Sequence, residues 1–173
     1  MDRKIRDLRT TDMSVYEFLA SSFRGEDYHV ISSYDGAWVT SGLYLLDGFP
    51  EDTGTMHVPT VAIEHRTTRA EPFQLGPGRK DTRHFQIDVY ARSDGERDDL
   101  GELIRTFLEY RIPVFDYNVI LTGGDYTNLA VGYAENIVVI SDRMNVNSKV
   151  LRHTLRVSFD LDIHISSGNS LIT

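Results

Sequence analysis

The chain has 173 residues, no cysteine and a formal net charge of −8 at pH 7, a size that suits one domain with a sizeable core. The lack of cysteine excludes a disulfide framework and a thiolate metal site, and no apolar run is long enough to predict a membrane span. The acidic balance argues against a general nucleic-acid binder, which would carry a basic surface, but permits a protein past which DNA slides without adhering.

The first predicted element is a helix from Val15 to Arg24 that follows a charged N-terminal extension, residues 1–12. Ser14 and Glu17 have the spacing of a capping box, and Gly25 would end the helix. Residues 28–33 are predicted to form a short strand. In the segment 34–55, glycines interrupt an apolar run that could be a second strand, and its role is left open.

A strand is predicted from Val58 to His65, and a long loop or extended hairpin follows it as a protruding arm, residues 66–83. The arm gathers five cationic side chains and one aromatic one: Arg66, Arg69, Phe73, Arg79, Lys80 and Arg83. We interpret these six residues as candidate contacts to another subunit or partner. The arm either is only a solvated segment or docks on an acidic neighbour or a nucleic-acid backbone.

The best-specified unit runs from Arg83 to Tyr110. Its first half alternates between apolar and polar residues, which predicts a half-buried strand. The polar side of this strand includes Asp88 and Tyr90. Ser93 and Glu96 then form a capping box, in which the Ser93 hydroxyl would accept from the Glu96 amide and the carboxylate would reach back to Ser93. The helix that follows has an apolar stripe: Leu100, Leu103, Ile104, Phe107 and Leu108.

Three further strands are predicted in the C-terminal third of the chain: residues 112–121, residues 136–142, which look buried, and an alternating strand of about fifteen residues from 151 to 166. Residues 125–135 are ambiguous, and residues 166–173 are expected to be a loose tail. The whole chain is predicted to be a single α+β domain, with two helices packed on one face of a mainly antiparallel or mixed sheet.

The sequence contains no catalytic motif that we recognise, and we expect neither an enzyme nor a bound cofactor. Asp160, Asp162 and His164 share one face of the last strand, as the ligands of a hard metal would, so a metal-dependent enzyme acting on nucleic acid or another phosphoester is one alternative. Ion pairing across the sheet is the other explanation for these residues. Glu64 and Asp88 could also face each other as in a nuclease, but the lysine that would complete that site is replaced by Tyr90.

The order of elements resembles that of the tail-terminator (tail-completion) and neck proteins of tailed bacteriophages. The resemblance rests on VPTVAIEHRTTRAEPFQLG, on RHFQIDVYARSDGERDDLGELIRTFLEY and on the long alternating C-terminal strand. It implies a virion protein, made in the host cytoplasm, that forms a ring, usually a hexamer. Such a ring caps the tail tube and joins it to the head connector while genomic DNA passes through without sequence-specific binding.

The resemblance brings no site residue with it, because the function of such a ring lies in its surfaces. Asp88, Tyr90, Asp160 and Asp162 are candidates for a polar face that lines the channel or an interface. The remaining alternative is a regulatory binding module whose arm, residues 66–83, contacts nucleic acid.

Overall fold

The computed structural model describes residues 8–32, 41–49, 56–72, 79–115, 128–141 and 154–165. Within these ranges the chain forms two helices and seven strands. In chain order they are α1 (Leu8–Gly25), β1 (Val30–Ile31), β2 (Leu43–Asp47), β3 (Thr60–Pro72), β4 (Arg79–Tyr90), α2 (Asp94–Leu108), β5 (Ile112–Phe115), β6 (Asn128–Ile140) and β7 (Thr154–Ile165).

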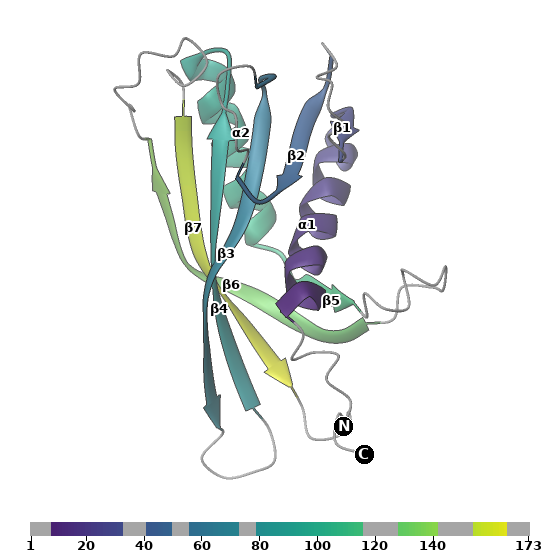
Figure 1. Ribbon diagram of the computed structural model, residues 1–173, viewed down its shortest axis with the longest axis vertical. Helices are drawn as coiled ribbons and strands as arrows, with labels where there is room; N and C mark the ends of the chain where they lie inside the picture. The colour runs from purple at the N-terminus through teal and green to yellow at the C-terminus, as the bar shows by residue number, and fades with distance from the viewer. Residues whose placement is uncertain are drawn as a thin grey trace.

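The strands form one mixed sheet in the order β1-β2-β3-β4-β7-β6-β5. β1 and β3 each run parallel to β2, whereas the β3–β4, β4–β7, β7–β6 and β6–β5 pairings are antiparallel. The sheet is strongly twisted and curled (Figure 1). The predicted α+β class, with a mixed sheet and two helices, is therefore confirmed.

The hydrophobic core lies between the two helices and one face of this sheet. Phe85 on β4 and Phe159 on β7 are register partners, and their stacked rings lie 5.4 Å apart between centroids. Above them Phe23 of α1 meets Phe107 of α2 edge to face, at 5.2 Å between ring centroids. Full burial of side chains of this size stabilises the fold by about 1.5–3 kcal/mol each, so both helices are held on the same face of the sheet.

The start of α2 confirms most of the predicted capping box. Ser93 is the N-cap, and its side chain accepts a hydrogen bond of 3.2 Å from the backbone N–H of Glu96. The carboxylate of Glu96, however, accepts from the backbone N–H of Arg92 at 2.7 Å and not from that of Ser93. The predicted return contact is thus displaced by one residue.

The capping box predicted at Ser14 is wrong, because α1 begins at Leu8 and Ser14 lies inside it. The Ser14 hydroxyl donates to the carbonyl oxygen of Thr10 at 2.6 Å. It also accepts from the backbone N–H of Phe115 on β5, at 2.9 Å. The serine therefore ties the helix to the edge of the sheet. The prediction that the helix ends at Gly25 is confirmed.

Several predicted strands have different bounds in the structure. β1 has two residues only, β5 is described over Ile112–Phe115 while residues 116–121 lie outside the described residues, and residues 128–135 and 136–140, which the prediction separates, join into the single strand β6. Asn136 has a φ of +52°, and the register of β6 against β7 shifts between Glu135 and Val138. This irregularity explains why no continuous alternation marks β6 in the sequence. The long C-terminal strand is confirmed from Thr154, while residues 151–153 and 166–173 lie outside the described residues.

The predicted arm is a β-hairpin that continues β3 and β4 beyond the core. The two strands remain in antiparallel register as far as the pair Pro72 and Arg79. Figure 1 shows them extending below the helices at the end of the molecule opposite to the start of α2. The tip of the hairpin, residues 73–78, lies outside the described residues.

Candidate functional site

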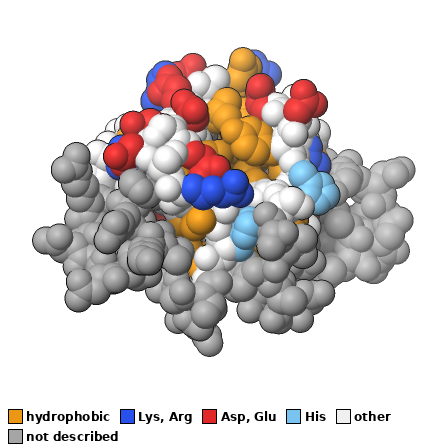
Figure 2. All heavy atoms as spheres, turned by 90° about the horizontal axis from the view of Figure 1, so that it is seen from above, with side chains coloured by type: hydrophobic (Ala, Val, Ile, Leu, Met, Phe, Trp, Pro, Cys, Tyr) orange, Lys and Arg blue, Asp and Glu red, His pale blue; other side chains and the backbone are white. Residues whose placement is uncertain are grey.

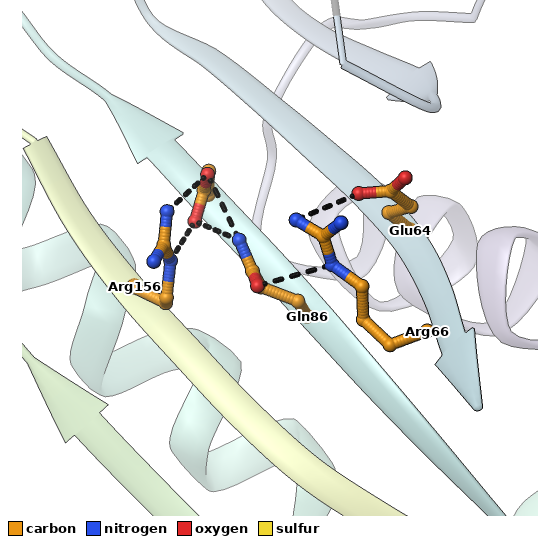
Figure 3. A network of polar contacts seen from close by, with 5 residues as sticks. Glu64, Arg66, Gln86 and Arg156 are labelled. Carbon is orange, nitrogen blue, oxygen red and sulfur yellow. Dashed lines mark hydrogen bonds and ion pairs between the residues drawn. The ribbon is translucent and has the colours of Figure 1, made fainter.

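The face of the sheet that points away from the helices, here called the outer face, carries a ladder of polar side chains across three strands (Figure 3). Asp88 on β4 accepts from Arg156 on β7 through both carboxylate oxygens, at 2.8 and 3.2 Å. Gln86 donates to the same carboxylate and accepts from Arg66 Nε at 3.2 Å. Arg66 then reaches Glu64 at 3.0 Å. Charges of alternating sign thus link β7, β4 and β3.

Part of this outer face is covered by the chain itself. Met56, Ala62 and Tyr90 form a small buried apolar cluster against which Leu46, Phe49 and Val58 pack. The guanidinium of Arg66 lies 5.1 Å from the centre of the Phe49 ring, a cation–π distance. Burial, with a smaller contribution from the charge of Asp88, raises the pKa of Tyr90 to about 12.

A second group of charges lies nearer the hairpin, on β4, β7 and β6. The Asp162 carboxylate pairs with Lys80 and accepts from the Thr82 hydroxyl at 2.5 Å. The neighbouring Asp160 accepts from His84 Nδ1 and from Asn136, each at 2.9 Å. Both carboxylates are therefore already surrounded by donors from adjacent strands.

The electrostatics of these two aspartates follow from that arrangement. Burial favours a higher pKa for Asp160, but the hydrogen bonds from Asn136 and His84 outweigh it and lower the pKa. For Asp162 the balance is the same, with Lys80 and Thr82 as the opposing donors. Both groups are held in the charged form by their partners.

This pairing bears on the metal-binding alternative. Among the described residues, no group of three or more histidine or acidic side chains could hold a metal ion. Asp160 and Asp162 instead make the contacts expected of ion pairing across a sheet, and the side chain of His164 lies outside the described residues. Glu64 and Asp88, the other candidate pair, each bind an arginine.

The structure separates the candidate arm residues into three groups. Arg66 and Arg69 are exposed, and Lys80 is partly exposed beside Asp162. Arg83 is only 1% exposed, on the helix side of the sheet, so it cannot contact a partner of this folded subunit. Phe73 and the side chain of Arg79 lie outside the described residues.

The candidate channel-facing residues are also less accessible than expected. Asp88 and Tyr90 are each 7% exposed and Asp162 is 2% exposed. Asp88 is bound within the ladder, Tyr90 packs against Met56 and Ala62, and Asp162 is bound by Lys80 and Thr82. Only Asp160 of this set is partly exposed. The polar face is therefore a stabilising network of the subunit, and three of its four candidates do not present themselves to a channel.

An exposed apolar stretch at the end of β6 was not predicted from the sequence. Val138, Val139 and Ile140 are 48%, 41% and 50% exposed, although the run was expected to be buried. A run of β-branched residues indicates a strand. Whether the side chains of such a strand are buried depends on what packs beside the strand in the fold. The sequence does not show this.

None of the described helices is long and apolar enough to cross a membrane. The sequence matches none of the protein-family models with which it was compared, and comparison with curated proteins found no relative.

Proposed function

We propose that this chain is a structural subunit that assembles into a ring at the neck or tail end of a tailed bacteriophage, where the ring caps the tail tube and joins it to the head connector. The observation that carries the proposal is the β3–β4 hairpin, whose paired strands run past the part of the sheet that the helices cover. A hairpin built in this way is suited to reach a neighbouring subunit or ring.

The lengths of the strands support an assembly role. β3, β4 and β7 have 13, 12 and 12 residues, about twice the usual strand length of 5–6 residues. A core of this size does not need such reach, because the helices pack against only part of each strand. The additional length places backbone and exposed side chains where another protein can contact them.

The chemistry of the outer face also favours an assembly role over catalysis. Four carboxylates of the outer face, Glu64 and Asp88 in the ladder and Asp160 and Asp162 in the second group, each contact a cationic or histidine side chain. A catalytic carboxylate must keep an oxygen available for substrate, water or metal. Groups held in this way stabilise a rigid subunit instead.

The distribution of charge suits the passage of DNA. Seen from above, the end of the molecule opposite to the hairpin shows hydrophobic side chains with acidic ones around them, together with some basic and histidine side chains (Figure 2). The acidic residues after α1 and in the first turns of α2 are Glu26, Asp27, Asp94, Glu96, Asp98 and Asp99. Together with the net charge of −8, they would repel a phosphate backbone and let it slide.

Native mass spectrometry and electron microscopy of the purified protein, with composition analysis of phage particles, test this proposal. We expect a closed ring, with six copies as the leading number, and the protein at the neck or tail end of the particle. A strictly monomeric protein that is absent from particles would contradict the proposal.

A hairpin variant makes the test more specific. Arg69→Glu reverses an exposed charge on the hairpin, and Arg105→Glu makes the same change on the exposed face of α2. Both variants should fold. We expect Arg69→Glu to reduce incorporation into particles and Arg105→Glu to leave it close to that of the natural chain. If both variants are incorporated into particles equally well, the hairpin has no part in the proposed assembly.

A further inference from the structure

The sheet has a long edge on β6 that no described strand covers. β5 pairs with β6 only as far as Gly132, whereas β6 continues to Ile140 with β7 on its other side. We call the stretch Tyr133–Ile140 the β6 edge. Figure 1 shows this part of β6 as the outermost strand of the upper half of the sheet. Its outward backbone groups are therefore directed away from the described strands.

The composition of the β6 edge is unusual for an edge strand. Native proteins protect edges with charges, prolines, bulges or very short strands, because an uncovered edge recruits other strands. The irregularity of the β6 edge lies between Glu135 and Val138, and residues 137–140 are four uncharged β-branched ones. Three of these four are more than two-fifths exposed. An uncovered edge with this composition is suited to accept a strand from outside.

The other ends of the sheet are protected in the usual ways. β1 is only two residues long. On β5, the backbone N–H of Phe115 is bound by the Ser14 side chain. Because the chain protects these edges and leaves the β6 edge apolar, the β6 edge is the part of the sheet most prepared for a partner strand.

A second stretch of similar length has no described strand on one side of it. β2 pairs with β3 only as far as Ile63, and β3 continues to Pro72 with β4 on its other side. We call Glu64–Pro72 the β3 edge. Its exposed side chains include the cations Arg66 and Arg69, with Thr67 and Thr68 between them.

The charges of the two edges decide how copies can meet. On the β3 edge, Arg66 is already bound to Glu64, and Arg69 is an exposed cation that could meet an acid of another copy. The β6 edge has no cation and carries one acid, Glu135. A β3 edge beside a β6 edge therefore avoids repulsion and covers both the apolar stretch and the backbone groups.

We propose that the β6 edge of one copy of this chain pairs with the β3 edge of the next, so that the sheet continues from subunit to subunit. Such a contact is heterologous, because different surfaces meet, and repeated contacts of this kind generate closed rings. The inference specifies the interface of the ring proposed above. It rests on that proposed function for the choice of a heterologous contact over a self-paired β6 edge.

Cross-linking tests the inference directly, because the chain has no cysteine of its own. Val138→Cys places one thiol on the β6 edge and Thr67→Cys places one on the β3 edge. Within one subunit the two strands are separated by β7 and β4, a span of roughly 14 Å across three strand spacings. A bismaleimide linker shorter than this span therefore joins them only between copies.

The double variant Val138→Cys with Thr67→Cys should give a ladder of cross-linked species that ends at the ring number, and each single variant should remain uncross-linked. The matched control combines Thr67→Cys with Tyr110→Cys, which places the second thiol at another exposed hydrophobic position, outside both edges. Cross-linked dimers from Val138→Cys alone, or no ladder from the double variant, would overturn the inference.

A charge on the edge gives an independent measurement. Val139→Lys should raise the concentration at half-assembly about tenfold or more, because a charge would have to be buried on pairing. Tyr110→Lys should leave it unchanged, and circular dichroism should show both variants folded. If the natural chain forms a ring and Val139→Lys assembles equally well, this inference fails and the proposed function stands. If the natural chain is monomeric and absent from particles, both this inference and the proposed function are wrong.

Discussion

Asp88 and Arg156 are register partners on β4 and β7, and the arginine binds both carboxylate oxygens, at 2.8 and 3.2 Å. Asp88 is largely buried and Gln86 also donates to it, so its removal leaves two donors without their acceptor. We expect Asp88→Ala to lower the free energy of unfolding by about 1–3 kcal/mol, measured by urea denaturation.

Glu102→Ala, which breaks an exposed pair with Arg105 on α2, is the control and should change stability little. Equal effects of the two variants would contradict the importance of the ladder.

Asp160 and Asp162 predict that the stability of the fold decreases in acid. The pKa of Asp160 and that of Asp162 are both lowered from the ordinary value of 3.8. A carboxylate whose pKa is lower in the folded state contributes stability above its unfolded pKa and loses it as pH falls through the folded value. We therefore expect the free energy of unfolding to fall as pH drops below about 4. The double variant Asp160→Asn with Asp162→Asn should flatten this dependence of stability on pH. An unchanged pH profile of the double variant would refute the assignment.

The burial of Tyr90 predicts a late step in an alkaline titration. Its pKa is raised to about 12, first by burial and then by Asp88, so the folded state holds the neutral form through pH values at which an ordinary tyrosine, with a pKa of 10.0, ionises. Stability linked to Tyr90 is present below pH 10 and is lost as pH rises toward 12. Phenolate formation can be followed by difference absorbance as the pH is raised. Tyr90→Phe should show one late-titrating tyrosine fewer than the natural chain. A late signal in Tyr90→Phe equal to that of the natural chain would contradict the raised pKa of this phenol.

The sequence was most informative where structure is decided locally. The strand from Arg83 to Tyr90 and the Ser93 cap depend on neighbours within a few residues, and both are confirmed. The expected half-burial of that strand is wrong, because Gln86, Asp88 and Tyr90 on its polar side are buried as well. Contacts that join distant segments could not be inferred in this way. Ser14 looks the same whether it caps a helix or lies inside one, and its partner Phe115 is 101 residues away. Likewise the run 137–140 has the composition of a buried strand, and only its place at a sheet edge leaves it exposed.

Ser14 itself gives a test of the link between α1 and β5. Ser14→Ala removes the acceptor of the Phe115 N–H, and we expect a loss of about 1–3 kcal/mol in the free energy of unfolding. Ser22→Ala is a close control, because the Ser22 hydroxyl makes the same type of helical bond, to Phe18 at 2.8 Å. Alanine is the better helix former, so the control should be neutral or slightly more stable. Hydrogen exchange should show faster exchange at Phe115 in the first variant only. Protection of Phe115 equal to that in the natural chain would disprove the link.

The close approach of α2 to β7 depends on Gly101. A Cβ at this position would lie 2.8 and 3.0 Å from the two methyl carbons of Leu155, and Leu155 is itself only 5% exposed. Alanine in a helix is favoured over glycine by about 1 kcal/mol, but overpacking costs about 1–3 kcal/mol. We therefore expect Gly101→Ala to destabilise the protein by roughly 1 kcal/mol in thermal or urea unfolding.

Gly95 provides the matched control for this prediction, because a Cβ there meets no atom within 4 Å in the same helix. Gly95→Ala should stabilise the protein by up to about 1 kcal/mol. In a Leu155→Ala background the space opposite Gly101 is vacated, so Gly101→Ala should then become favourable. This reversal of sign separates a steric effect from an effect on helix propensity. If Gly101→Ala proves as stabilising as Gly95→Ala in the natural background, the helix does not pack on β7 through this glycine.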